Sequence, residues 1–301
     1  MLMKQLVVAI AAATLSSAAF ASDHGHDSHG AAAGHGAAAE HGHHAAVADE
    51  VIEDQRAGLA KATKGKGFGP QAPRDIDSKA GKNDIVFSQA PDYTAMNLCN
   101  IHFHESAEHK GGEFTTYAGN GDGEGTGSGY KYNGHLSHDE SAPADEVCNS
   151  AHGTLAVGDT IEVHYVHSTA DITPGATLGS CLAADVDNNP QLRVMAQVYV
   201  LVNKGGEDFG KLATVSKKGG KYQAAMPTNL GTPVNYIGST TGPSYNEKGS
   251  PFQVSWSVYP KVAKVNIATV GAWCKGNQFK EDHAHGVRNL VKNPDLLSEI
   301  K

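Results

Sequence analysis

The stretch IHFHE at residues 101–105 decides the fold, together with the later stretch IEVHYVH at residues 161–167. Both have the polar and apolar side chains typical of β-strands. Side chains two positions apart on a strand share a face, so His102 and His104 point the same way. His164 adds a third imidazole from the second strand. Three histidines from two neighbouring strands, with one position left open, favour a catalytic zinc over a closed structural zinc.

The residues around these histidines separate a metal site from simpler explanations. Glu162 shares a face with His164, which favours a metal site over two histidines that alternate by chance on a surface strand. His167 faces away from His164 by strand parity, so we assign it a structural role. The run from His104 to His109 resembles the zinc-peptidase motif HExxH but is one residue too long. On a helix, residues five apart lie about 140° around the axis and could not share one metal.

From about residue 82 the chain predicts a single β-rich domain, over residues 82–301, with few helices. The candidate strands are Met96–Glu105, Thr160–His167, Leu192–Val202, Phe252–Tyr259 and Val262–Ile267. A short helix is predicted within Val287–Ile300, although Pro294 interrupts it. The glycine-rich run at residues 119–129 lacks the spaced acidic ligands of an EF-hand, so a mobile loop is predicted there.

The N-terminal part of the chain predicts export. Residues 1–21 have a basic start, an apolar stretch from Leu6 to Phe20 and a small-residue cleavage site, which together indicate a secretory signal peptide. Residues 22–48 contain seven histidines among Ala, Gly and Asp and predict a disordered tail. Such a tail either gathers metal or serves as a flexible leader, and both interpretations stay open. We expect residues 49–81 to form a linker and an N-terminal arm.

Composition narrows the partners and the compartment. The formal net charge of −8 argues against nucleic acid or an anionic membrane as a partner. Four cysteines in an exported chain predict two disulfides and a bacterial periplasmic or secreted location. Of the three possible connectivities we favour Cys148 with Cys181 and Cys99 with Cys274.

Several motifs together resemble a known enzyme family. His102-Phe103-His104, Glu108-His109 and Glu162-x-His164-x-x-His167 resemble the core of alpha-type carbonic anhydrases. The segment YIGSTTGP at residues 236–243, followed by Val254-Ser255-Trp256, is similar to that family's Thr-Thr turn and pocket tryptophan. The context LCNIHFHE at residues 98–105, Cys181 before residues 193–202 and His283-Ala284-His285 look more like the delta-type carbonic anhydrase-like family. The resemblance covers about residues 85–295.

This resemblance implies a fold and a reaction. The fold would be mainly β, built on a large central, mostly antiparallel sheet with few short helices. Zn²⁺ would be bound by His102, His104 and His164, and a metal-bound hydroxide would hydrate carbon dioxide reversibly to bicarbonate.

It also implies roles for neighbouring residues. Thr240 would accept the hydroxide's proton as a hydrogen bond, Glu108 would accept from Thr240, and Thr241 would line the substrate position. Glu162 would orient His164, and His109 would support Glu162. Asn100, whose side chain is shorter, takes the place of a glutamine partner in the family. Val166 and Trp256 would form the apolar wall that uncharged carbon dioxide needs. The chain departs from the alpha pattern at Glu105, where a tryptophan usually follows the HxH motif.

Two other functions fit the same sequence. One is a non-catalytic, zinc-binding or zinc-buffering periplasmic protein, in which the histidine-rich tail matters most. The other is an inactive carbonic anhydrase-related protein that kept its ligands. Storage needs only metal ligands, whereas catalysis also needs the partners Glu108, Glu162 and Thr240.

Overall fold

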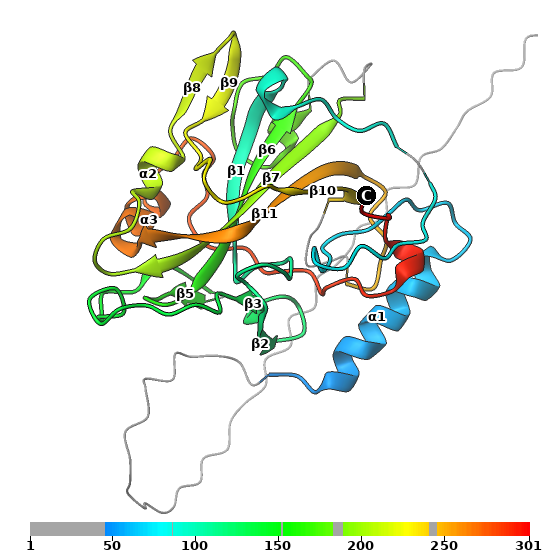
Figure 1. Ribbon diagram of the computed structural model, residues 1–301, viewed down its shortest axis with the longest axis horizontal. Coiled ribbons are helices and arrows are strands. Elements are labelled where there is room, and N and C mark those ends of the chain that lie inside the picture. The colour runs from blue at the N-terminus through cyan, green and yellow to red at the C-terminus, as the bar shows by residue number, and fades with distance from the viewer. Residues whose placement is uncertain (1–45, 86, 152, 183–188, 241–245) are drawn as a thin grey trace, which may run out of the picture. The chain divides into compact units, whose positions relative to one another are not determined.

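The computed structural model describes residues 46–301 apart from residues 86, 152, 183–188 and 241–245. In this part of the chain the main element is a five-stranded sheet with the strand order β1-β6-β7-β11-β10 (Figure 1). Its strands are β1 (Asn97–Glu105), β6 (Thr160–Ser168), β7 (Leu192–Val202), β10 (Val234–Ser239) and β11 (Gln253–Asn266). The prediction of a mainly β fold with a large central sheet is confirmed. The sheet is mixed, because β7 and β11 run parallel while the other neighbours are antiparallel.

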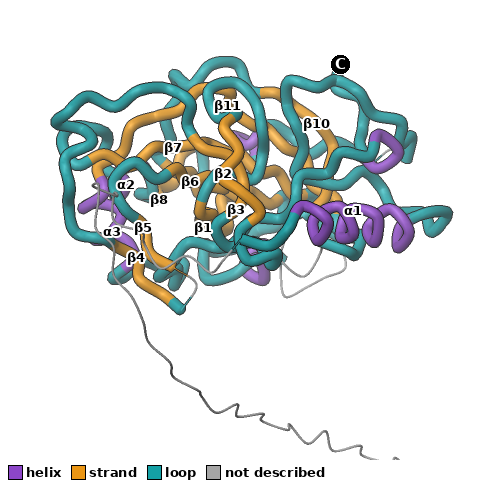
Figure 2. The backbone as a smooth tube through the Cα atoms, turned by 90° about the horizontal axis from the view of Figure 1, so that it is seen from below, coloured by secondary structure: helices purple, strands orange, loops and turns teal. Residues whose placement is uncertain are grey.

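Smaller elements surround this sheet. Three hairpins are formed by β2 (Thr116–Asn120) with β3 (Ser128–Lys131), β4 (Val147–Ser150) with β5 (Gly153–Leu155), and β8 (Val215–Lys218) with β9 (Lys221–Ala224). The α-helices are α1 (Asp49–Thr63), α2 (Phe209–Leu212) and α3 (Ile267–Cys274). Short 3₁₀ turns occur at Tyr93–Ala95, Leu178–Cys181 and Pro294–Leu296. Figure 2 shows α2 and α3 together at one end of the strands and α1 at the other.

Both faces of the sheet are buried, which fixes where each side chain of a strand points. On β1, Ile101 and Phe103 pack into one apolar cluster with Tyr165 of β6. Ala196 of β7 and Trp256 of β11 belong to a separate cluster. Because neighbouring side chains alternate between the faces, the histidines of β1 point away from Phe103. Burial on both sides therefore holds the register of the strands.

Two predicted strands form a single one. The expected strands Phe252–Tyr259 and Val262–Ile267 are continuous in β11, with a register shift between Val258 and Val262. Pro260 lies at this irregularity, and proline has no backbone N–H to donate to a ladder. The interruption seen in the sequence is therefore a bulge within a strand.

One local prediction is wrong. The segment Val287–Ile300 contains only the 3₁₀ turn Pro294–Leu296, because its backbone binds distant segments: the amide of Val287 donates to Gly125 and that of Val291 to Pro73. The run at residues 119–129, predicted as a mobile loop, forms the turn between β2 and β3. Asp122 Oδ1 caps it by accepting hydrogen bonds from three successive backbone amides, at residues 124–126.

The expected linker and arm at residues 49–81 contain helix α1, which the sequence analysis missed. Asp49 and Glu50 occupy its first turn and Lys61 its last, which complements the helix dipole. Gln55 donates a hydrogen bond to Gly123 O, and Arg56 donates one to Leu290 O. These contacts attach the helix to the β2–β3 turn and to the C-terminal segment.

The disulfide pairing differs from the one we favoured. The bridges are Cys99–Cys181 and Cys148–Cys274. Cys99 lies on β1, which packs against the 3₁₀ turn that ends at Cys181. Cys148 lies on β4, which packs against α3, and α3 ends at Cys274. Spacing alone could not distinguish these partners. Within the described residues, no helix is both long and apolar enough to span a bilayer.

The burial of His167 is expected to make the free energy of unfolding depend on pH. Its side chain is fully buried on β6, and burial lowers its pKa from 6.5 to about 4. As pH falls through this window the unfolded chain takes up the proton first, so stability is present above pH 6.5 and is lost towards pH 4. The unfolding free energy of the wild type should drop between pH 7 and pH 5. In His167→Phe we expect this drop to be smaller by about 2 kcal/mol. Urea unfolding at both pH values measures this, and equal losses would contradict the assignment.

Candidate metal centre

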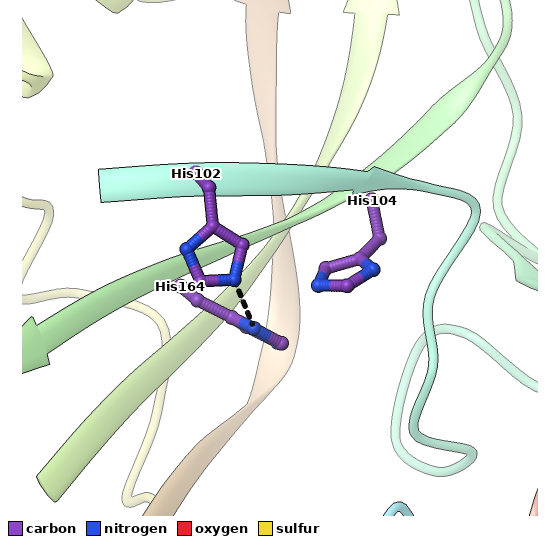
Figure 3. A group of neighbouring side chains, drawn as sticks. All are labelled: His102, His104 and His164. Carbon is purple, nitrogen blue, oxygen red and sulfur yellow. Dashed lines mark hydrogen bonds between the residues drawn. The ribbon is translucent and has the colours of Figure 1, made fainter. Parts of the chain in front are cut away.

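Three imidazoles converge between β1 and β6. The antiparallel register places His102 directly opposite His164, and His104 opposite Glu162. One nitrogen from each of His102, His104 and His164 lies within 4.8 Å of the other two. Figure 3 shows the three rings turned towards one another from the two strands. Three nitrogens this close together could hold one metal ion.

A different acceptor fixes the orientation of each ring. His102 Nδ1 lies 2.7 Å from Asn100 Oδ1, and His104 Nδ1 lies 2.8 Å from the carbonyl oxygen of Gly286. His164 instead uses Nε2, which is 2.9 Å from Glu162 Oε1. Since these acceptors require N–H donors, the lone pairs remain on Nε2 of His102, Nε2 of His104 and Nδ1 of His164. Those are the atoms that face the common centre.

The environment favours the neutral form of His102 and His104, which a metal ligand requires. Burial lowers the pKa of His102 well below its usual value, and the neighbouring histidines add to the effect. Burial also lowers the pKa of His104 to about 4, despite the opposing charge of Glu108. The Nε2 atom of His104 is buried without a hydrogen-bond partner among the described residues. A buried orphan nitrogen beside two others fits a borderline-soft divalent ion such as zinc.

Glu162 is held as a buried carboxylate. His109 contributes both its backbone amide, 3.0 Å from Oε2, and its Nδ1, 2.7 Å from Oε1. Burial alone would raise the pKa of Glu162, but the charges and hydrogen bonds of His109 and His164 outweigh it and hold the pKa well below its usual value. The other ring nitrogen of His109 lies 2.6 Å from the hydroxyl of Tyr236. The predicted neighbours of His164 therefore form one connected polar network.

The partners of Glu108 and Thr240 differ from those expected. Glu108 is buried 3.7 Å from His104 Nδ1 and 3.9 Å from His164 Nε2, and its Oε1 accepts from the backbone amide of Arg288. Thr240 borders the same cavity, but its hydroxyl lies 2.7 Å from Ser250 Oγ rather than bonding to Glu108. Ser250 reaches Thr240 because it follows in the loop before β11. Thr241 lies outside the described residues.

The three histidines open onto a cavity of about 200 Å³ with a mainly apolar wall. Val166, Val194, Val254 and Trp256 come from three adjacent strands and line it. Trp256 is held by a hydrogen bond of 3.1 Å from Nε1 to Ser239 O, and its ring packs on His164. The cavity thus offers a small uncharged molecule an apolar surface beside the nitrogen cluster.

Sequence reasoning missed the pair His285 and Glu281 at this cavity. His285, to which the sequence analysis gave no role at the site, lies with its ring 5.5 Å from that of His102 and lines the cavity with Glu281. Its Nε2 lies 2.6 Å from Glu281 Oε2, and this hydrogen bond raises the pKa of His285. The segment reaches the site by backbone pairing of His285 with β1, on both sides of His104. The alternation in His283-Ala284-His285 was the one signal of such an extended segment.

Comparisons with solved structures find carbonic anhydrases at low similarity. An alpha-carbonic anhydrase from Thermovibrio ammonificans, in complex with the inhibitor sulfanilamide, is 17% identical with a TM-score of 0.27, over 83% of this chain and 96% of that one. A hyperthermostable carbonic anhydrase from an active hydrothermal vent chimney is 14% identical with a TM-score of 0.26, over 77% and 92%. The Photobacterium profundum alpha-carbonic anhydrase is 15% identical with a TM-score of 0.25, over 81% and 95%.

The family assignment rests on sequence. A comparison with curated proteins finds no match. The family model described as delta carbonic anhydrase matches residues 93–269, which is more than half of the 301-residue chain and includes β1, β6, β7 and β11 up to Asn266. The chain therefore belongs to the delta carbonic anhydrase family.

Proposed function

We propose that this protein binds Zn²⁺ through His102, His104 and His164 and hydrates carbon dioxide reversibly to bicarbonate. The observation that carries the proposal is the set of three pre-oriented imidazole nitrogens that opens onto an apolar cavity. Bound zinc acts as a Lewis acid that lowers the pKa of water to about 7 and so supplies a nucleophile at neutral pH. The remaining roles fall to side chains of this chain.

The polar residues around the histidines keep the ligands ready. Asn100 and Glu162 fix the tautomers of His102 and His164, so little reorganisation is needed when the ion enters. His109 in turn holds Glu162. Glu108, 3.7 Å from His104 Nδ1 and 3.9 Å from His164 Nε2, would offset part of the ion's charge. The network therefore supports catalysis and exceeds what simple metal storage needs.

The cavity wall orients the substrate and its partner group. Val166 and Trp256 receive uncharged carbon dioxide without a cationic clamp. The hydroxyl of Thr240, oriented by Ser250, is the group that we assign to hydrogen bonding with the reacting oxygen. Thr241 keeps its predicted role of lining the substrate position.

The location follows from the same reasoning. The two disulfides suit an oxidising compartment. We propose that residues 1–21 direct export to the periplasm or the medium, where the enzyme would act on dissolved carbon dioxide and bicarbonate.

Replacing one ligand tests the metal centre. We expect His164→Ala to lose bound zinc and carbon dioxide hydration together, because two imidazoles hold the ion weakly. Metal analysis and stopped-flow hydration with a pH indicator measure both quantities. His138→Ala, at a fully exposed histidine, is the matched control and should keep both. Full activity or full zinc content in His164→Ala would reject the site.

Replacing the pocket hydroxyl separates catalysis from binding. Thr240→Ala should keep zinc but slow hydration about 100-fold, because a hydrogen bond to the reacting oxygen is lost. Thr240→Ser keeps a hydroxyl and should retain most of the activity. If Thr240→Ala hydrates carbon dioxide as fast as the wild type, the role of Thr240 is wrong. Zinc-loaded wild type without hydration activity would instead identify an inactive member of the family.

The histidine-rich segment tests the zinc-gathering alternative. Seven histidines in residues 22–48 can bind zinc, so this segment either captures metal or serves as a flexible leader. Deletion of residues 22–48 should slow zinc uptake at low metal concentration and leave the turnover of the loaded enzyme unchanged. The measurement is activity recovery after chelation, at limiting and at saturating zinc. A loaded, truncated enzyme with reduced turnover would contradict a role restricted to metal supply.

A further inference from the structure

A second cavity lies on the opposite face of the sheet from the metal centre. Its volume is about 390 Å³, and it is bordered by β7, β10, β11 and the segment before β1. On β7, Val194 lines the metal cavity, whereas Arg193 lines the second one. On β11, Trp256 lines the metal cavity and Ser257 lines the second one. Strand alternation therefore separates the two cavities by one layer of backbone.

Arg193 brings a buried positive charge into this cavity. Its side chain is only 7% exposed. Nε donates to Pro91 O at 2.7 Å, Nη1 to Ser257 Oγ at 2.9 Å and Nη2 to Ala90 O at 2.5 Å. All three acceptors are neutral, and a guanidinium has five N–H donors. Two donors therefore remain for another acceptor, and burial lowers the pKa of Arg193, as expected for a cation without a bonded counter-charge.

The carboxylate nearest to this cation is engaged elsewhere. Asp92 lines the cavity, but its Oδ1 accepts from the amide of Thr94 at 3.0 Å and from the hydroxyl of Thr94 at 2.6 Å. Asp92 lies towards solvent, where salt screens its charge. The remaining repulsion from Asp92 weakens the binding of an anion, and more so for each further negative charge, so the cavity suits a monoanion best.

Neutral donors complete the polar lining. The hydroxyls of Tyr93 and Tyr259 have no hydrogen-bond partner among the described residues, and both side chains border the cavity. Ser257 Oγ donates to Asn235 Oδ1 at 2.7 Å, which leaves the amide N–H groups of Asn235 as donors. A guanidinium with adjacent hydroxyl and amide donors matches the planar, two-oxygen shape of a carboxylate.

We propose that this second cavity binds a small planar monoanion of the carboxylate type, with Arg193 as its counter-charge and Tyr259 and Asn235 as further donors. Bicarbonate and small organic carboxylates share this chemistry. The site is separate from the metal centre and does not depend on the proposed reaction.

Ligand-observed NMR on the zinc-loaded protein tests the proposal. The probes are acetate, ¹³C-bicarbonate and, as a neutral isostere of acetate, acetamide. Asn235→Asp keeps the acceptor for Ser257 and adds a negative charge to the cavity wall. Asn149→Asp, on β4 and away from the cavity, adds the same charge elsewhere. Both variants keep the metal centre, so anion binding at the metal is common to them.

We expect acetate affinity to fall at least ~10-fold in Asn235→Asp and to remain unchanged in Asn149→Asp. Tyr259→Phe, which removes one donor and keeps the ring, should weaken acetate binding about 3-fold. Tighter binding of bicarbonate than of acetate would identify the reaction product as the occupant, and the reverse order an organic carboxylate. Equal acetate affinity in the two aspartate variants, or acetamide binding as tight as acetate, would overturn the proposal. Loss of hydration activity with acetate binding intact would affect only the proposed enzyme function.

Discussion

The antiparallel register between β1 and β6 is the constraint on which the metal centre depends. It sets His102 against His164 and His104 against Glu162. A slip of one residue would turn every one of these side chains to the other face of the sheet. Apolar residues such as Phe103 and Val163 are fully buried and prevent that slip. The packing that stabilises the fold therefore also sets the geometry of the ligands.

Electrostatics then determines what the assembled cluster can do. Burial disfavours charge on His102 and His104, so their nitrogens keep lone pairs. The one buried negative charge that orients a ligand, on Glu162, is stabilised by His109 rather than by solvent. A neutral nitrogen set with a charged support is the combination that attracts a divalent ion.

The sequence predicted the parts of the site that lie on regular strands. Strand periodicity was sufficient for His102, His104, His164 and Glu162, because their positions follow from alternation and one pairing. It could not find the approach of His285 or the Thr240–Ser250 contact, since both depend on irregular segments that pair far along the chain. Helix α1, weakly amphipathic, and the disulfide partners were missed for the same reason: tertiary contacts rather than local pattern decide them.

The bridge Cys99–Cys181 joins β1 to the 3₁₀ turn Leu178–Cys181, and both contribute residues to the metal cavity. Cys99 precedes Asn100, the partner of His102, and its carbonyl accepts from Gly175 and Ser180 of the segment that carries Leu178 into the cavity. Reduced chains would lack this covalent tie between ligand strand and lining. It follows that the histidine cluster and the lining beside it share one redox requirement: thiol oxidation completes this part of the cavity, and a reducing environment would leave it held by packing and hydrogen bonds alone.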